Sequence, residues 1–310
     1  MIDEFGVVAS SGGAAYKRRN MTGTANPVFC ALDTVSLPEA LAWGSAIAPF
    51  VGGLKLGLEF FNANGPQGVR AVAELGLPIF ADLKLHDIPN TVAGGIRAVL
   101  PLGVSIVNVH TSGGAAMMRA AADAAAAAGA KRPKIIGVTV LTSLDASDLF
   151  DIGVVGSASD QVLRLARLAK TSGLDGVVCA AHEIQMLRSE FGPDFMLIVP
   201  GIRPVGAETA DQKRVTTPKE GHRLGADILV IGRPITAAPD PASAARAIRD
   251  ELFPPAARAW PSKSAASNPL KPSRPRPAPA PRIWVLTSSR KARGQSPRRA
   301  PTSSRCSHPA

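Results

Sequence analysis

The chain of 310 residues has few cysteines and few aromatic residues: three Cys, one Tyr, three Trp and ten Phe. Cys30 and Cys179 fall within apolar runs and Cys306 lies close to the C-terminus. This spacing suits neither a disulfide framework nor a zinc site. We therefore expect thiols that are buried or idle in a reducing compartment.

Long apolar segments and nucleotide-binding loops are also missing. No stretch reaches the roughly 18 uninterrupted apolar residues of a membrane span, and residues 1–25 lack the long apolar core of a signal peptide. No Walker loop or Gly-x-Gly-x-x-Gly pattern follows an apolar run, which argues against binding of nucleoside triphosphates or dinucleotides. The sequence thus predicts a cytoplasmic protein without a membrane partner.

Acidic residues are absent from one end of the chain. Residues 254–310 contain 12 Lys or Arg, no Asp or Glu, and 12 of the 27 prolines. The whole chain has a net charge of +11, which leaves −1 (11 − 12) for residues 1–253. This composition favours a disordered basic tail over a second domain. Such a tail could bind nucleic acid or an acidic membrane surface, or it could have no selected role.

Eight short apolar runs recur in the rest of the chain, and most end in a polar or charged residue. They lie at 28–32, 53–54, 79–81, 104–109, 135–141, 176–179, 195–199 and 228–231. Segments rich in Ala, Leu and Arg lie between them, for example at 37–48, 114–128, 161–171 and 242–252. Apolar strands that alternate with helices indicate a parallel sheet covered on its outer side. We predict an α/β fold, a single-domain (β/α)8 TIM barrel over residues 26–253, with disordered extensions at 1–25 and 254–310.

The most informative segment is residues 82–91, where several ionisable groups follow one apolar run. Because alternate side chains of a strand share a face, we expect Asp82 and Lys84 to lie side by side. Pro89 removes a backbone donor, so the strand is expected to end near Asp87. An isolated Asp-x-Lys pair is most often a solvated surface pair. Here it falls at the carboxyl end of a barrel strand, where the catalytic groups of this fold lie.

Further polar residues are expected at the same end of the barrel, because each follows an apolar run: Asp33, Lys55, Thr142, Arg203 and Arg233. In such barrels the loops after the seventh and eighth strands often bind phosphate. Those loops contain Arg203 and the pair Gly232-Arg233, and a guanidinium offers a fork of donors that suits phosphate oxygens. One such Arg is most often a surface charge, whereas two favour a phosphorylated substrate.

Together these residues resemble the orotidine 5′-phosphate decarboxylase family over about residues 26–252. The matching motifs are residues 82–91, Leu32-Asp33, Lys55, 141–143, 200–204, Asp211-Gln212 and 231–233. The resemblance implies a homodimeric barrel that converts orotidine 5′-monophosphate to uridine 5′-monophosphate (UMP) and carbon dioxide. It also implies that neither a metal nor an organic cofactor takes part.

The resemblance assigns a role to each matching residue. Lys84 would stabilise and protonate the carbanion left by carbon dioxide, within an alternating array of Lys55, Asp82, Lys84 and Asp87. Asp82 would lie near the substrate carboxylate, and Asp87 and Thr91 would reach into the neighbouring subunit's site. The remaining contacts implied are Asp33 and Lys55 to the ribose, Thr142 to the pyrimidine, and Arg203, Gln212, Gly232 and Arg233 to the phosphate.

Two other functions remain open at this point. A metal-dependent decarboxylase or an epimerase on the same scaffold could share the Asp-x-Lys pattern, but a divalent ion beside Asp82 would want a further carboxylate where Lys55 stands. A protein that binds polyanions through its basic tail leaves the charged strand ends unexplained, so nucleic acid is not an expected partner. His110 could be a base or a metal ligand; we expect it to pack at a strand end, with a following Ser or Thr capping the next helix.

Overall fold

The computed structural model describes residues 26–204 and 216–254, and within them eight parallel strands form a closed barrel in chain order. The strands are β1 (Val28–Ala31), β2 (Gly53–Leu56), β3 (Ile79–Leu85), β4 (Ile106–His110), β5 (Lys134–Val138), β6 (Gly176–Val178), β7 (Met196–Val199) and β8 (Ile228–Ile231). Parallel pairing continues around the ring, and β8 pairs with β1. The predicted (β/α)8 barrel is confirmed.

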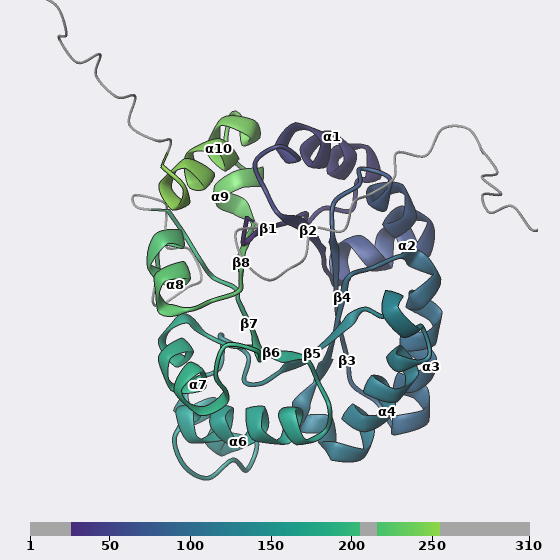
Figure 1. The fold of residues 1–310 in the computed structure, drawn as a ribbon, viewed down its shortest axis with the longest axis vertical. Helices are drawn as coiled ribbons and strands as arrows, with labels where there is room; N and C mark the ends of the chain where they lie inside the picture. Colours follow the sequence, from purple (N-terminus) through teal and green to yellow (C-terminus); the bar gives the residue numbers. More distant parts are fainter. Residues whose placement is uncertain (1–25, 205–215, 255–310) are drawn as a thin grey trace, which may run out of the picture. The chain divides into compact units, whose positions relative to one another are not determined.

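Helices surround the strands on the outside of the barrel (Figure 1). They are α1 (Leu37–Ile47), α2 (Leu58–Ala73), α3 (Pro89–Val99), α4 (Gly114–Ala126), α5 (Ala146–Asp151), α6 (Ala158–Thr171), α7 (Ile184–Phe191), α8 (Pro218–Leu224), α9 (Arg233–Thr236) and α10 (Pro241–Leu252). Short 3₁₀ turns lie at Leu100–Leu102, Thr111–Gly113, Gly129–Lys131 and Ala181–Glu183. Side-chain caps begin several helices, because Ser, Thr and Asp can accept from otherwise unpaired N–H groups at a helix start: Ser36, Asp145, Ser157, Thr217 and Asp240.

The strand β3 ends at Leu85 and Asp87 lies on the loop just past it, because Pro89 is the first residue of α3 and the chain must turn between the two. The predicted end near Asp87 is confirmed. The cap expected after His110 was wrong, because the next helix is not capped by Ser or Thr. The hydroxyl of Thr111 instead donates to the carbonyl of Val138, 2.7 Å away on β5.

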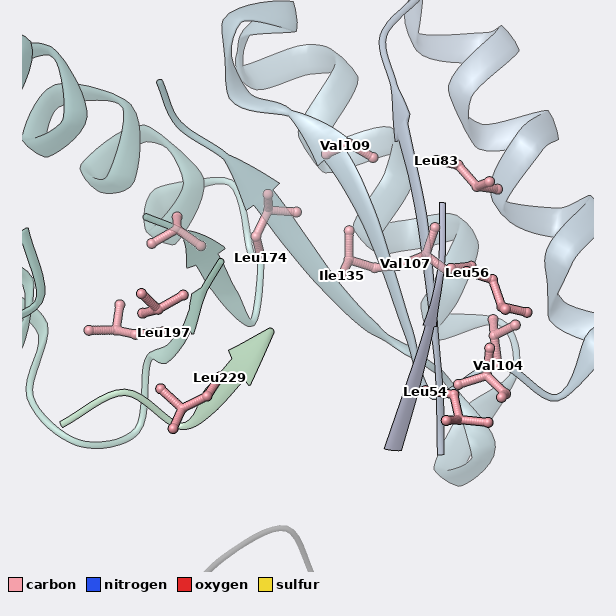
Figure 2. Packing of buried hydrophobic residues seen from close by; sticks show 14 of the residues in the cluster. Leu54, Leu56, Leu83, Val104, Val107, Val109, Ile135, Leu174, Leu197 and Leu229 are labelled. Carbon is pink, nitrogen blue, oxygen red and sulfur yellow. The ribbon is translucent and has the colours of Figure 1, made fainter. Parts of the chain in front are cut away.

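Most of the core lies between the barrel and its helices. Outward-facing residues of every strand contribute, and Figure 2 shows part of this layer, including Leu54 of β2, Val107 of β4 and Leu229 of β8. Cys30 and Cys179 lie in the same layer as free, buried thiols. Burial raises the pKa of Cys30 to about 12 and that of Cys179 well above its usual value, which makes both thiols poor nucleophiles.

The barrel interior changes from apolar to polar along the strands. Its amino-terminal part is packed by apolar side chains that alternate with the outer layer: Phe29, Ala31, Phe80, Ile106, Ile136, Ile198, Ile228 and Val230. A Cβ at Gly53 would lie 2.3 Å from the Phe29 ring, so the glycine makes room for that ring. The next inward positions towards the carboxyl ends are Asp33, Lys55, Asp82 and Asn108. The same alternation that fills the core therefore delivers charged groups to one end of the barrel.

None of the helices within residues 26–204 and 216–254 is long and apolar enough to cross a membrane. The extensions predicted at 1–25 and 254–310 lie outside the described residues, apart from Pro254. Their predicted disorder stays a prediction.

Candidate active site

The centre of the candidate site is an ion-pair chain across three neighbouring strands. The Nζ atom of Lys55, on β2, lies 3.1 Å from Oδ1 of Asp33 and 3.2 Å from Oδ2 of Asp82. The Nζ atom of Lys84 lies 2.6 Å from Oδ1 of Asp82, both on β3. The expected Asp82–Lys84 contact is confirmed, and the charges alternate in sign from Asp33 to Lys84.

Burial makes these charges depend on one another. Lys55 is only 9 % exposed and Asp82 only 8 %. Burial by itself would lower the pKa of Lys55, but the carboxylates of Asp82 and Asp33 outweigh it and hold this pKa above its usual value. Burial would likewise raise the pKa of Asp82, but Lys55, Lys84 and a hydrogen bond from Asn108 hold it below its usual value. Both residues are therefore fixed in their charged forms at neutral pH.

The backbone is irregular where β3 carries Lys84. This residue has a φ of 50°, and it is the sole non-glycine residue with a positive φ in the part of the chain that the structure describes. The pairing of β3 with β4 also shifts register between Ala81 and Leu85. The side chain of Asn108, from β4, accepts a hydrogen bond from the N–H of Lys84 and donates one to Asp82, each at 2.7 Å.

A pocket of about 300 Å³ opens beside the ion-pair chain at the carboxyl ends of the strands. Of the predicted site residues, it brings together Asp33, Lys55, Asp82, Lys84, Thr142, Arg203, Gly232 and Arg233. Arg203 is 7 % exposed, and its N–H donates to the carbonyl of Thr216 at 3.1 Å. One cavity is thus lined by two sets of charged groups. The carboxylates and ammonium groups lie on or just after β1, β2 and β3, and the two arginines follow β7 and β8.

Two of the predicted residues that the structure describes are not part of this lining. Asp87 and Thr91 are exposed, one just before α3 and one in its first turn. The Oδ1 atom of Asp87 accepts from the N–H of Ile88 at 2.6 Å. Gln212 lies outside the described residues.

Comparison with known proteins shows to which family the chain belongs. A sequence model described as "Orotidine 5'-phosphate decarboxylase / HUMPS family" matches residues 26–248, almost the whole barrel. The chain belongs to this family. The resemblance read from the motifs is therefore confirmed.

Individual members of the family are also similar to the chain. An orotidine 5′-phosphate decarboxylase of Rhodospirillum rubrum is 55% identical over 234 residues, which is 74% of this chain and 95% of the relative. One of Paramagnetospirillum magneticum is 53% identical over 231 residues, 73% of this chain and 98% of the relative. The crystal structure of orotidine 5′-phosphate decarboxylase from Lactobacillus acidophilus superposes with a TM-score of 0.65 at 37% identity, covering 74% of this chain and 99% of that one.

His110 packs at the carboxyl end of β4, as expected from the sequence. Its ring packs against that of His86, with centroids 5.3 Å apart. Burial, His86 and Lys84 together lower the pKa of His110, so the ring is neutral at pH 7. Within residues 26–204 and 216–254, no group of three or more His, Cys, Asp or Glu side chains is arranged to hold a metal ion.

The motifs did not point to two residues of the site. Asn108 is completely buried, and a signal was present, since it is the one amide between Val107 and Val109 in an apolar strand. Gly57 follows β2, and a Cβ there would lie 3.1 Å from Nζ of Lys55 and 3.3 Å from Oδ1 of Asp33. A Cβ at this position would crowd that ion pair, and no sequence pattern revealed this close approach.

Proposed function

We propose that the protein decarboxylates orotidine 5′-monophosphate to UMP and carbon dioxide in pyrimidine biosynthesis. The observation that carries the proposal is the Asp33–Lys55–Asp82–Lys84 chain, which lines the same pocket as Arg203 and Arg233. Membership of the family and the names of the similar enzymes support this reaction.

Lys84 is the proposed carbanion stabiliser and proton donor. When the bond between the ring and its carboxylate breaks, the electron pair stays on the ring carbon in an sp² orbital that the π system cannot delocalise. An ammonium held at that carbon stabilises the charge and then gives it a proton, which leaves a neutral amine to be reprotonated from water. The contact of Lys84 with Asp82 supports this role, because the carboxylate holds the ammonium in one orientation at the pocket wall.

Asp82 faces the leaving group in this proposal. Its carboxylate, held ionised by Lys55 and Lys84, would lie near the carboxylate of the substrate. Repulsion between the two raises the ground state and disappears as neutral carbon dioxide forms. Asp82 thereby combines two functions, since it also orients Lys84.

The rest of the substrate is assigned by the chemistry of the pocket wall. Asp33 and Lys55 can pair with ribose hydroxyls, and Thr142, which also lines the pocket, is the proposed contact of the pyrimidine. Arg203 and Arg233 offer guanidinium donors to the phosphate beside the backbone of Gly232. Gln212 is proposed as a further phosphate contact from the family resemblance alone.

We also propose that two subunits share each site, with Asp87 and Thr91 contributed by the partner. Both residues are exposed in the single chain. Apolar side chains are also exposed in the segments that follow β1, β2 and β3: Val35 at 62 %, Leu58 at 49 % and Ile88 at 67 %. Exposed apolar residues that cluster around polar ones are typical of a protein interface.

No metal or organic cofactor is part of the proposal. The ammonium of Lys55 stands between the carboxylates of Asp33 and Asp82, where a divalent cation would otherwise bind. The test is to follow conversion of orotidine 5′-monophosphate by ultraviolet absorbance and to identify UMP as the product, with and without excess chelator. Equal rates support the proposal. No conversion, or conversion that chelator abolishes and metal restores, would favour the metal-dependent decarboxylase.

A further inference from the structure

Asn108 links the backbone of one proposed catalytic residue to the side chain of another. It lies on β4 with none of its surface exposed, and it is not among the residues that line the pocket. Its Oδ1 atom accepts from the N–H of Lys84, and its Nδ2 atom donates to Oδ1 of Asp82. Oδ1 of Asp82 also binds the ammonium of Lys84, which closes a ring of contacts through all three residues.

The position of Asn108 coincides with the irregular part of β3. Ala81 pairs with Val107 and Leu85 pairs with Val109, so that Asp82, Leu83 and Lys84 face the single residue Asn108. A strand interrupted in this way leaves N–H groups without partners on the neighbouring strand. The amide oxygen of Asn108 supplies the missing acceptor for Lys84.

Lys84 also adopts a conformation that needs support from its surroundings. A non-glycine residue with a positive φ is strained, because its Cβ crowds the backbone, and such residues persist only where the neighbouring structure holds them. The 2.7 Å hydrogen bond from the backbone N–H of Lys84 to the side chain of Asn108 holds the main chain in this conformation. Without it, the main chain could relax towards a regular strand and move the ammonium.

We propose that Asn108 is a positioning residue that holds the Lys84 backbone in its left-handed conformation and the Asp82 carboxylate in place, so that the Lys84 ammonium is oriented for reaction. This inference rests on the proposed function of Lys84. The proposed role requires an amide at position 108, because one acceptor is needed for the N–H of Lys84 and one donor for the carboxylate of Asp82. Asp has the same size but lacks the donor, and Leu lacks both.

The test compares Asn108→Leu and Asn108→Asp with the control Thr111→Val. Thr111 is equally buried and near the same end of β4, it does not line the pocket, and its hydroxyl makes one buried hydrogen bond to a backbone carbonyl. For both Asn108 variants we expect kcat to fall about 100-fold, the scale for a misplaced reacting group. KM and the Kd for UMP should change little, because Asn108 does not line the pocket. Thr111→Val should lose stability to urea but keep kcat.

The pH profile separates positioning from a loss of folded protein. The charged groups that face Asp82 are Lys55 from β2 and Lys84 from its own strand, with His110 further along β4. Removal of the Asn108 donor raises the pKa of Asp82, so the acid limb of kcat should move to higher pH, more so in Asn108→Asp. A smaller folded fraction would scale the profile without moving it. If Asn108→Leu fails to fold, Asn108→Asp, which has the same size, still decides.

A measurement that needs no activity completes the test. Hydrogen exchange of the Lys84 N–H, followed by NMR, should accelerate in Asn108→Leu and remain slow in Thr111→Val. Wild-type kcat in both Asn108 variants, or unchanged exchange at Lys84, would overturn the inference. If the wild-type protein itself does not decarboxylate orotidine 5′-monophosphate, the proposed function fails, and the exchange result still shows whether Asn108 holds Lys84.

Discussion

Replacing Lys55 by Met gives a quantitative test of the buried ion-pair chain. Met has a similar length but no charge, so the carboxylates of Asp33 and Asp82 lose the ammonium between them. At 3.2 Å and an effective dielectric constant of about 20, the attraction between Lys55 and Asp82 is roughly 5 kcal/mol. The cost of burying Lys55 offsets part of it. The side chain of Asp33 is 53 % exposed, and its pair with Lys55 adds little.

We therefore expect Lys55→Met to lower the free energy of unfolding at pH 7 by about 3 kcal/mol, at the lower end of the cost of breaking a buried pair. The pKa of Asp82 is lowered in the folded protein, so its stabilising effect is present above the unfolded value of 3.8 and is lost as the pH falls through the folded value. The gap between wild type and variant should be constant above about pH 5 and narrow below about pH 4.

The assay is urea unfolding of both proteins from pH 7 down to pH 3, with Lys134→Met as the matched control. Lys134 pairs with Asp175 at 3.0 Å, but its side chain is 45 % exposed and Asp175 keeps the guanidinium of Arg132 at 2.7 Å. The control should lose less than about 1 kcal/mol. Equal losses in the two variants, or a Lys55→Met gap that does not depend on pH, would refute the reasoning from burial.

Three further predictions concern binding, assembly and the tail. Arg233→Ala should weaken UMP binding far more than uridine binding, measured by calorimetry; an unchanged preference for the nucleotide would remove Arg233 from the phosphate site. The variants Asp87→Asn and Lys84→Ala are each expected to be inactive alone. After the two proteins are mixed and exchange subunits, about a quarter of wild-type activity should return, because about half of the dimers contain one subunit of each kind and have one intact site of two. A mixture that stays inactive after mass spectrometry has verified subunit exchange would place Asp87 in its own subunit's site. Deleting residues 254–310 should leave kcat and the dimeric state unchanged, because α10 ends at Leu252 and the family match at residue 248; loss of activity in the truncated protein would show that the tail supports the barrel.

The barrel and the ion-pair chain of its site were predictable from the alternation of side chains along the strands. A period of two places Phe80 in the barrel core and Asp82 one step further along the same face, and the order of eight apolar runs fixes which strands are neighbours. The contact of Asp82 with Lys84 followed from the same rule. The two arginines that share the pocket followed from the position of their loops after β7 and β8.

The irregular backbone at Lys84 was not predictable in the same way. The local pattern of residues 82–85 reads as an ordinary strand, and nothing in it indicates a positive φ. The conformation depends on Asn108, which lies on the next strand and is separated by a whole helix. Interactions between distant segments of this kind can override local preference, and they are typical of functional sites.

The most direct test of the central claim is the rate of carbon dioxide release by Lys84→Ala at saturating orotidine 5′-monophosphate, with UMP binding and urea stability measured on the same preparation. Loss of one electrostatic donor commonly costs about 10² to 10³ in rate, and loss of a group that also delivers the proton should cost more. We predict a folded protein that binds UMP and has lost at least about 10³ in kcat. A variant that keeps near wild-type kcat would contradict the assignment of Lys84 as the group that stabilises and protonates the carbanion.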